Sequence, residues 1–187
     1  MKRFLAVLVL ALCALGHAQN APAKAPAAAD AGPVKDPVAS SLRMLLPRSQ
    51  NNVVGAVEAM PADKFAYKPT PDQMPFGHLV VHIIESNNML CAKVADVPAP
   101  KVDELKETDA KDKLLAATKA SYAFCSDALA KMDDSKLGDS VELFGGRKFP
   151  RAMGALGLAS GWADHYATAA MYLRLNGILP PSAQPKK

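Results

Sequence analysis

The sequence has no apolar run long enough to cross a membrane. Its longest, "FLAVLVLALCALG", spans about 13 residues after Lys2 and Arg3, whereas a bilayer-spanning helix needs about 20. Residues 1–18 follow the order of a secretory signal peptide: positive charge first, then apolar residues, then small residues ending at Ala18. We therefore expect residues 1–18 to be cleaved and the mature protein to be periplasmic or secreted, with no stable membrane anchor.

Positive charge and aromatic residues are too sparse for a nucleic-acid interface. Aromatic residues make up 6% of the chain, and the formal net charge is only +4. Two of those charges, on Lys2 and Arg3, would leave with the signal peptide. Because no stripe of lysine and arginine interleaved with aromatic residues is visible, we expect no nucleic-acid partner.

Runs of alternating apolar and polar residues are also missing, which argues against an extensive sheet. Apolar residues spaced three and four apart instead predict four helices, over about residues 38–60, 75–94, 109–131 and 150–176. Four long helices predict an all-α fold, a four-helix bundle over residues 37–183. Residues 19–36 are rich in alanine and proline and have almost nothing to bury, so we expect a disordered linker there.

Two details of the bundle follow from proline and glycine. Pro47 lies inside the first predicted helix and is expected to kink it or split it in two, because proline removes one backbone hydrogen bond. Gly145 and Gly146 lie between the third and fourth predicted helices, where they are expected to close a small hairpin or a loop.

Cysteine is scarce, with three in the whole chain, of which Cys13 belongs to the predicted signal peptide. Cys91 and Cys125 lie on separate predicted helices. In an oxidising compartment they are expected to form one disulfide, which closes a loop of about 35 residues and contributes about 3 to 4 kcal/mol. Two buried free thiols are the alternative.

The groups best suited to chemistry are the histidines. The chain lacks the Gly-Lys-Ser/Thr phosphate loop, and its one reversed pair, His82 with Glu85, does not match the Glu-x-x-His repeats of di-iron bundles. His78 and His82 are four residues apart and share a helix face, while His165 lies in the fourth helix. A divalent metal between helices needs about three imidazole or carboxylate donors. His82 and His165, completed by His78 or Glu85, would supply them; hydrogen-bonded core histidines are the alternative.

Two segments resemble the DinB-like superfamily. "AMPADKFAYKPTPDQMPFGHLVVHI" resembles its connection between the first two helices, "DHYATAAMYLRLNGILPPS" resembles its last helix and ending, and the likeness covers roughly residues 38–183. The resemblance implies a four-helix bundle, often a homodimer, with a divalent metal (Zn, Ni or Fe) on three histidines. One comes from the second helix and two, four residues apart, come from the last. His82 and His165 match two of these positions, whereas Gly161 stands at the third.

The sequence is therefore compatible with two alternative functions. The first is an exported metal-dependent protein, a hydrolase or a transferase, with His82 and His165 as ligands and His78 or Glu85 in place of the missing third. The second is a non-catalytic envelope bundle that binds a small molecule or a protein and retains a degenerate metal site.

Overall fold

The computed structural model describes residues 32–185, so the predicted signal peptide and most of the predicted linker lie outside the described residues. The described part is mostly helical, with α1 (Pro37–Ala59), α2 (Phe76–Ala95), α3 (Lys111–Ala130) and α4 (Arg151–Leu175). The 3-10 turns η1 (Ala62–Lys64) and η2 (Pro181–Ala183) follow α1 and α4. Each predicted helix is present with ends within two residues of the prediction, which confirms the four helices.

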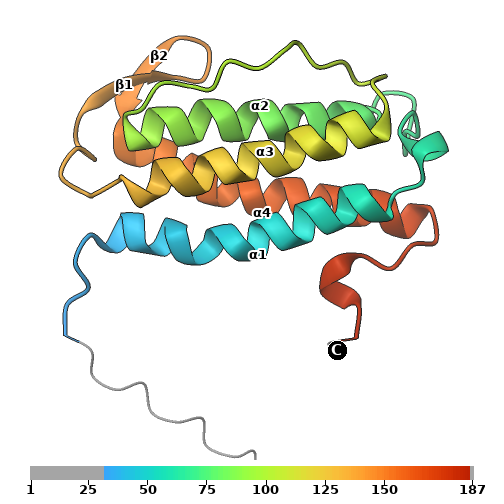
Figure 1. The fold of residues 1–187 in the computed structure, drawn as a ribbon, viewed down its shortest axis with the longest axis horizontal. Helices are drawn as coiled ribbons and strands as arrows, with labels where there is room; N and C mark the ends of the chain where they lie inside the picture. Colours follow the sequence, from blue (N-terminus) through green and yellow to red (C-terminus); the bar gives the residue numbers. More distant parts are fainter. Residues whose placement is uncertain (1–31, 186–187) are drawn as a thin grey trace, which may run out of the picture. The chain divides into compact units, whose positions relative to one another are not determined.

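The helices pack as a bundle with one shared core (Figure 1). Both α1 and α2 pack against both α3 and α4, so α1 and α2 occupy opposite corners. The largest fully buried side chains of the core come from all four helices and include Val53, Ile83, Leu114, Tyr122, Leu158 and Tyr172. Among residues 32–185, no helix combines the length and apolar character that a membrane span requires.

The predicted split of the first helix is wrong, because α1 is continuous through Pro47. Proline lacks only the N–H that would bond to the carbonyl of Arg43, and its ring is exposed on the outer face. Leu46 before it and Val53 after it are both buried. Packing against the core therefore keeps the helix continuous through the proline.

The predicted glycine turn closes a hairpin. Strands β1 (Ser140–Leu143) and β2 (Arg147–Pro150) pair antiparallel between α3 and α4. The turn has positive φ at Phe144, Gly145 and Gly146, of 28°, 74° and 80°. Glycine adopts such angles without steric cost, which explains why the turn forms at this pair.

The connection from α2 to α3 is a long segment without helix or strand. We call residues 97–110 the strap; it runs back along α2 and α3 (Figure 1). One end is fixed where the N–H of Val97 donates to the carbonyl of Ala92. Near the other end, His78 Nδ1 lies 2.7 Å from Glu107 Oε2. Gly77 permits this close approach, because a Cβ there would collide with the carbonyl oxygen of Glu107.

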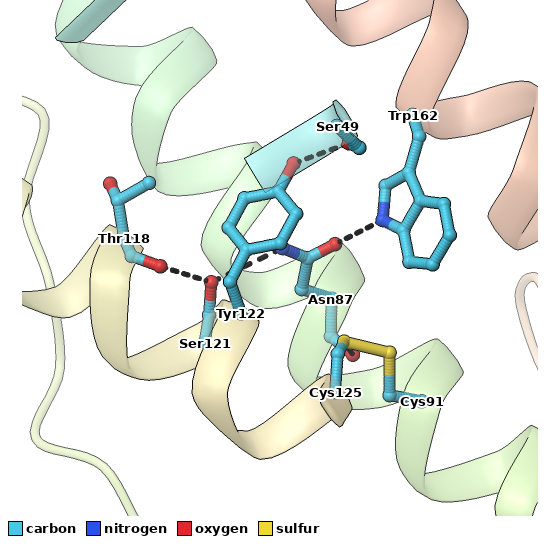
Figure 2. The surroundings of a disulfide bond; sticks show 8 residues. All are labelled: Ser49, Asn87, Cys91, Thr118, Ser121, Tyr122, Cys125 and Trp162. Carbon is cyan, nitrogen blue, oxygen red and sulfur yellow. Dashed lines mark hydrogen bonds between the residues drawn. A yellow bond between two sulfur atoms is a disulfide. The ribbon is translucent and has the colours of Figure 1, made fainter. Parts of the chain in front are cut away.

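A buried cluster of polar side chains joins all four helices (Figure 2). The side-chain oxygen of Asn87 accepts a hydrogen bond from Trp162 Nε1 at 2.9 Å, and its nitrogen donates to Ser121 Oγ at 3.2 Å. Beside it, the hydroxyls of Ser49 and Tyr122 are 2.8 Å apart. We call these five residues the Asn87 cluster. Hydrogen bonds within the core offset the cost of removing these polar groups from water.

The two cysteines of the described chain form a disulfide next to this cluster (Figure 2). The Cα atoms of Cys91 and Cys125 are 5.2 Å apart, within the range of unstrained bridges. The bridge, and not a pair of free thiols, therefore joins α2 to α3.

Candidate functional site

The structure brings His82 of α2 and His165 of α4 together. Their ring centroids are 5.0 Å apart, with the rings edge to face at 81°. His82 is exposed, whereas His165 is half-buried and its Nδ1 is buried without a hydrogen-bond partner. Burial lowers the pKa of His165 below its usual value and neighbouring His82 lowers it further, while Asp164 acts in the opposite direction. At neutral pH these effects favour the neutral form of the His165 ring.

The third donor that a metal site needs is missing from this pair. Gly161, one turn before His165, offers no side chain, although a Cβ there would make only ordinary contact, 3.7 Å from Cε1 of His165. His78 is hydrogen-bonded to Glu107 of the strap. Within residues 32–185, no three His, Cys, Asp or Glu side chains are grouped to hold a metal. The residues present do not complete the implied three-donor set, so His82 and His165 would hold a metal as a pair only, and we derive no catalytic step from it.

Glu85, the other proposed third ligand, lies in the wall of a different feature. A cavity of about 830 Å³, which we call the strap cavity, lies between α2, the strap and the β1–β2 hairpin. Its apolar wall includes Ile84, Met89, Ala92, Val102 and Leu105. The volume falls within the range of about 300 to 1,000 Å³ typical of small-molecule sites.

A buried amide of α2 also lines this cavity. Asn88 is only 8% exposed, and its side-chain oxygen has no hydrogen-bond partner. Leaving a buried acceptor unpaired costs about 1 to 3 kcal/mol. Such a cost is tolerated at a binding site, where a ligand supplies the missing donor.

Arg151 lines the end of the cavity near the hairpin. Its guanidinium donates to the carbonyl of Lys93 and to Asp96 Oδ1, which ties the start of α4 to the end of α2. The hydrogen bond from Lys136 and the charge of Arg151 hold the pKa of Asp96 below its usual value. This end is thus built from paired charges and forms a fixed wall.

Neither Asn88 nor the strap cavity was predicted from the sequence. Asn88 stands beside Asn87 in an apolar helix, and the strap has no periodicity from which its packing could be inferred. The one feature of the sequence that pointed toward this cavity was the mixture of acidic and apolar residues in the proline-containing connection between the second and third helices.

Comparison with known proteins gives the family and the fold. The family model of the DinB superfamily matches residues 45–168. The crystal structure of a DinB-like protein from Bacillus subtilis is 18% identical, with a TM-score of 0.62 over 78% of this chain and 99% of that one. For a DinB-like protein from Bacillus cereus the values are 12%, 0.61, 79% and 97%. None of the curated proteins matches the chain.

Proposed function

The chain belongs to the DinB superfamily, and for this member we propose the function of a non-catalytic bundle that binds a small molecule in the strap cavity. The observation that carries the proposal is Asn88, a residue in the wall of a cavity of about 830 Å³, whose side-chain oxygen is buried and has no hydrogen-bond partner among residues 32–185. Ligand sites combine an apolar wall with a few polar groups that fix orientation. Asn88 supplies such a group.

The strap supports the proposal because it provides a way in. Within the described chain, no backbone hydrogen bond ties residues 98–105 to the helices. Segments with few hydrogen bonds and few buried contacts open at low free-energy cost. A ligand can therefore enter by displacing the strap without unfolding a helix.

An uncharged fluorescent probe, Nile red, tests this proposal. We expect saturable binding of one probe per chain with fluorescence enhancement, unaffected by EDTA because no metal is involved. Ala99→Trp places a bulky ring on the exposed strap beside the cavity and should abolish the signal. Ala123→Trp, at an exposed position of α3, is the matched control and should bind as wild type does. Equal binding to both variants contradicts the proposal.

Metal binding by the histidine pair is the second candidate, and one distance favours it. Two imidazoles on a single tetrahedral zinc ion have ring centres about 5 Å apart, and those of His82 and His165 are separated by 5.0 Å. The open space at Gly161 lets a side chain be added beside them. We therefore expect weak zinc binding by wild type and tight binding by Gly161→His.

Equilibrium dialysis against Zn²⁺, followed by elemental analysis, measures both affinities. His165→Ala is the control and should bind no zinc at this site. Equal zinc affinities of wild type, Gly161→His and His165→Ala would show that the histidine pair does not bind zinc.

We also propose that the protein acts outside the cytoplasm. The order of residues in positions 1–18 supports export, and the Cys91–Cys125 bridge is of a kind that persists in oxidising compartments. N-terminal sequencing of protein from the periplasm or medium should begin just after Ala18. The homodimer implied by the family stays a prediction, to be checked by light scattering.

A further inference from the structure

We propose that the ligand of the strap cavity is an apolar amine, a small molecule with a hydrocarbon body and a protonated nitrogen. The inference rests on the proposed function and specifies the chemical class that the same cavity takes. Three independent properties of the cavity lead to it: the sign of its charge, the orphaned acceptor in its wall and its apolar surface.

The charge around the cavity is predominantly negative. Four carboxylates line it without an ion-pair partner in residues 32–185, those of Glu85, Asp103, Glu104 and Glu142. Asp96 pairs with both Arg151 and Lys136, and among residues 32–185 Lys93 is the lining cation without an ion-pair partner. The lining as a whole carries five carboxylates against the two cations Lys93 and Arg151. Carboxylates that face one cavity raise the local concentration of cations and repel anions.

The acceptor in the wall selects a donor. The oxygen of Asn88 is buried and has no hydrogen-bond partner among residues 32–185. Once the strap is displaced, a protonated amine can donate to this oxygen while its remaining hydrogens face the carboxylates. Hydrogen bonds from a charged donor are about twice as strong as those between neutral groups. A carboxylate or phosphate ligand would present only acceptors to this oxygen, and a hydrocarbon would leave it unpaired.

The remaining surface suits an apolar body. Ile84, Met89 and Leu105 line the cavity from α2 and from the strap. Methionine is flexible enough to adapt to ligands of different outline. A purely polar amine would leave this surface in contact with water, so the ligand needs hydrocarbon in addition to its charge.

The placement of the charges also explains how the ligand is enclosed. Asp103 and Glu104 lie on the strap, whereas Glu85 lies on α2. A cation between them attracts both sides of the cavity, so binding draws the strap toward α2. With no backbone hydrogen bond holding residues 98–105, the strap is free to respond.

Three probes that share one ring test the charge preference: 1-naphthylmethylammonium, 1-naphthylmethanol and 1-naphthoate. Calorimetric titration of the full chain at low salt should give affinities in that order, with the ammonium compound bound at least about fivefold more tightly than the alcohol. Raising the salt should narrow this difference, because the carboxylates are solvent-accessible.

Two variants assign the preference to the strap. Asp103→Asn combined with Glu104→Gln should bring the ammonium and alcohol affinities within about twofold of each other, and leave the alcohol affinity unchanged. Asp127→Asn, an exposed acidic position on α3 outside the cavity, is the control and should keep the wild-type preference. All three substitutions keep the side-chain size, so the variants are expected to fold. Circular dichroism verifies that they do.

The outcomes separate the two proposals. If the alcohol or naphthoate binds as tightly as the ammonium compound, and Ala99→Trp abolishes that binding, the amine assignment is overturned. The small-molecule site is retained in that case. An ammonium preference that survives in the double variant also overturns the assignment. No binding of any probe at millimolar concentration overturns both proposals.

Discussion

Asn87 and Asn88 are neighbours on α2 with opposite surroundings. Asn87 is 1% exposed, and both ends of its amide are hydrogen-bonded, to Trp162 and Ser121. Asn88 is 8% exposed, and its oxygen has no partner. One residue step rotates a side chain by about 100° around a helix, so the first amide points into the core and the second lies beneath the strap.

The difference separates an amide that holds helices together from one that we propose to contact a ligand. A satisfied amide fixes how helices pack, since any shift breaks its bonds. An unsatisfied one carries a free-energy cost in the isolated protein that only another molecule can offset. Stability and ligand binding should therefore respond in opposite ways to substitutions at the two positions, and the following predictions test that contrast.

The largest effect is expected from breaking the bridge beside the Asn87 cluster. Combining Cys91→Ala with Cys125→Ala removes a link between residues 34 positions apart. The free energy of unfolding should fall by about 3 to 4 kcal/mol, because the unfolded chain regains its loop entropy. Urea denaturation measures the loss. Reductant should lower the midpoint of wild type and leave the double variant unchanged; a loss under about 1 kcal/mol contradicts the prediction.

Removal of the satisfied amide should have the next largest effect. Asn87→Leu is expected to lower the free energy of unfolding by about 2 to 3 kcal/mol, because it leaves the indole N–H of Trp162 buried without an acceptor. Urea denaturation with the disulfide intact gives the value. In a Trp162→Phe background the same substitution should cost less, since no donor is orphaned there. Equal costs in both backgrounds would show that the hydrogen bond is not the cause.

The Asn87 cluster should also make stability fall at alkaline pH. Burial raises the pKa of Tyr122 to about 12, against a lowering by its hydrogen bonds with Ser49 and Asn87. Unfolded tyrosine releases its proton near pH 10, so between pH 10 and 12 the unfolded state binds fewer protons and stability falls as pH rises. The loss should reach about 2 kcal/mol.

Urea midpoints at pH 9 and at pH 11.5 measure this alkaline loss. Tyr122→Phe should have a shallower dependence than wild type. Tyr166→Phe, which removes a hydroxyl outside the cluster, should follow wild type. An unchanged slope in Tyr122→Phe would assign the loss to another group.

The smallest change in stability is expected at the unsatisfied amide. Asn88→Leu removes a buried acceptor that has no donor, so the free energy of unfolding should change by less than about 1 kcal/mol in either direction. The same variant should bind 1-naphthylmethylammonium less tightly than wild type. A loss of stability as large as that of Asn87→Leu would mean that Asn88 has a structural partner after all.

The sequence predicts what depends on local spacing. Apolar residues three and four apart determine where each helix lies, and the glycine pair determines the hairpin turn, because both follow from backbone geometry. The split predicted at Pro47 is wrong for a related reason. Its local cost is real, but buried neighbours such as Leu46 and Val53 offset it in the folded bundle.

The candidate sites depend on contacts that spacing does not encode. The resemblance pointed to His82 and His165 as a pair, and their rings are adjacent. Nothing in the sequence distinguishes Asn87 from Asn88, since the same residue type occupies both positions and only the packed helices and the strap decide which oxygen is satisfied. The strap itself has no periodic pattern, so its path over α2 could not be derived.

The disulfide has a consequence for proteolysis of the strap. Cys91 precedes the strap and Cys125 follows it, so the whole strap belongs to a covalently closed ring. Lys101 and Lys106 are exposed on it and offer sites to trypsin. A cut at either lysine opens the ring without releasing a fragment: the nicked protein migrates as a single species until reductant divides it in two. The strap can thus be severed while α2 and α3 stay joined, a way to remove its continuity and keep the bundle.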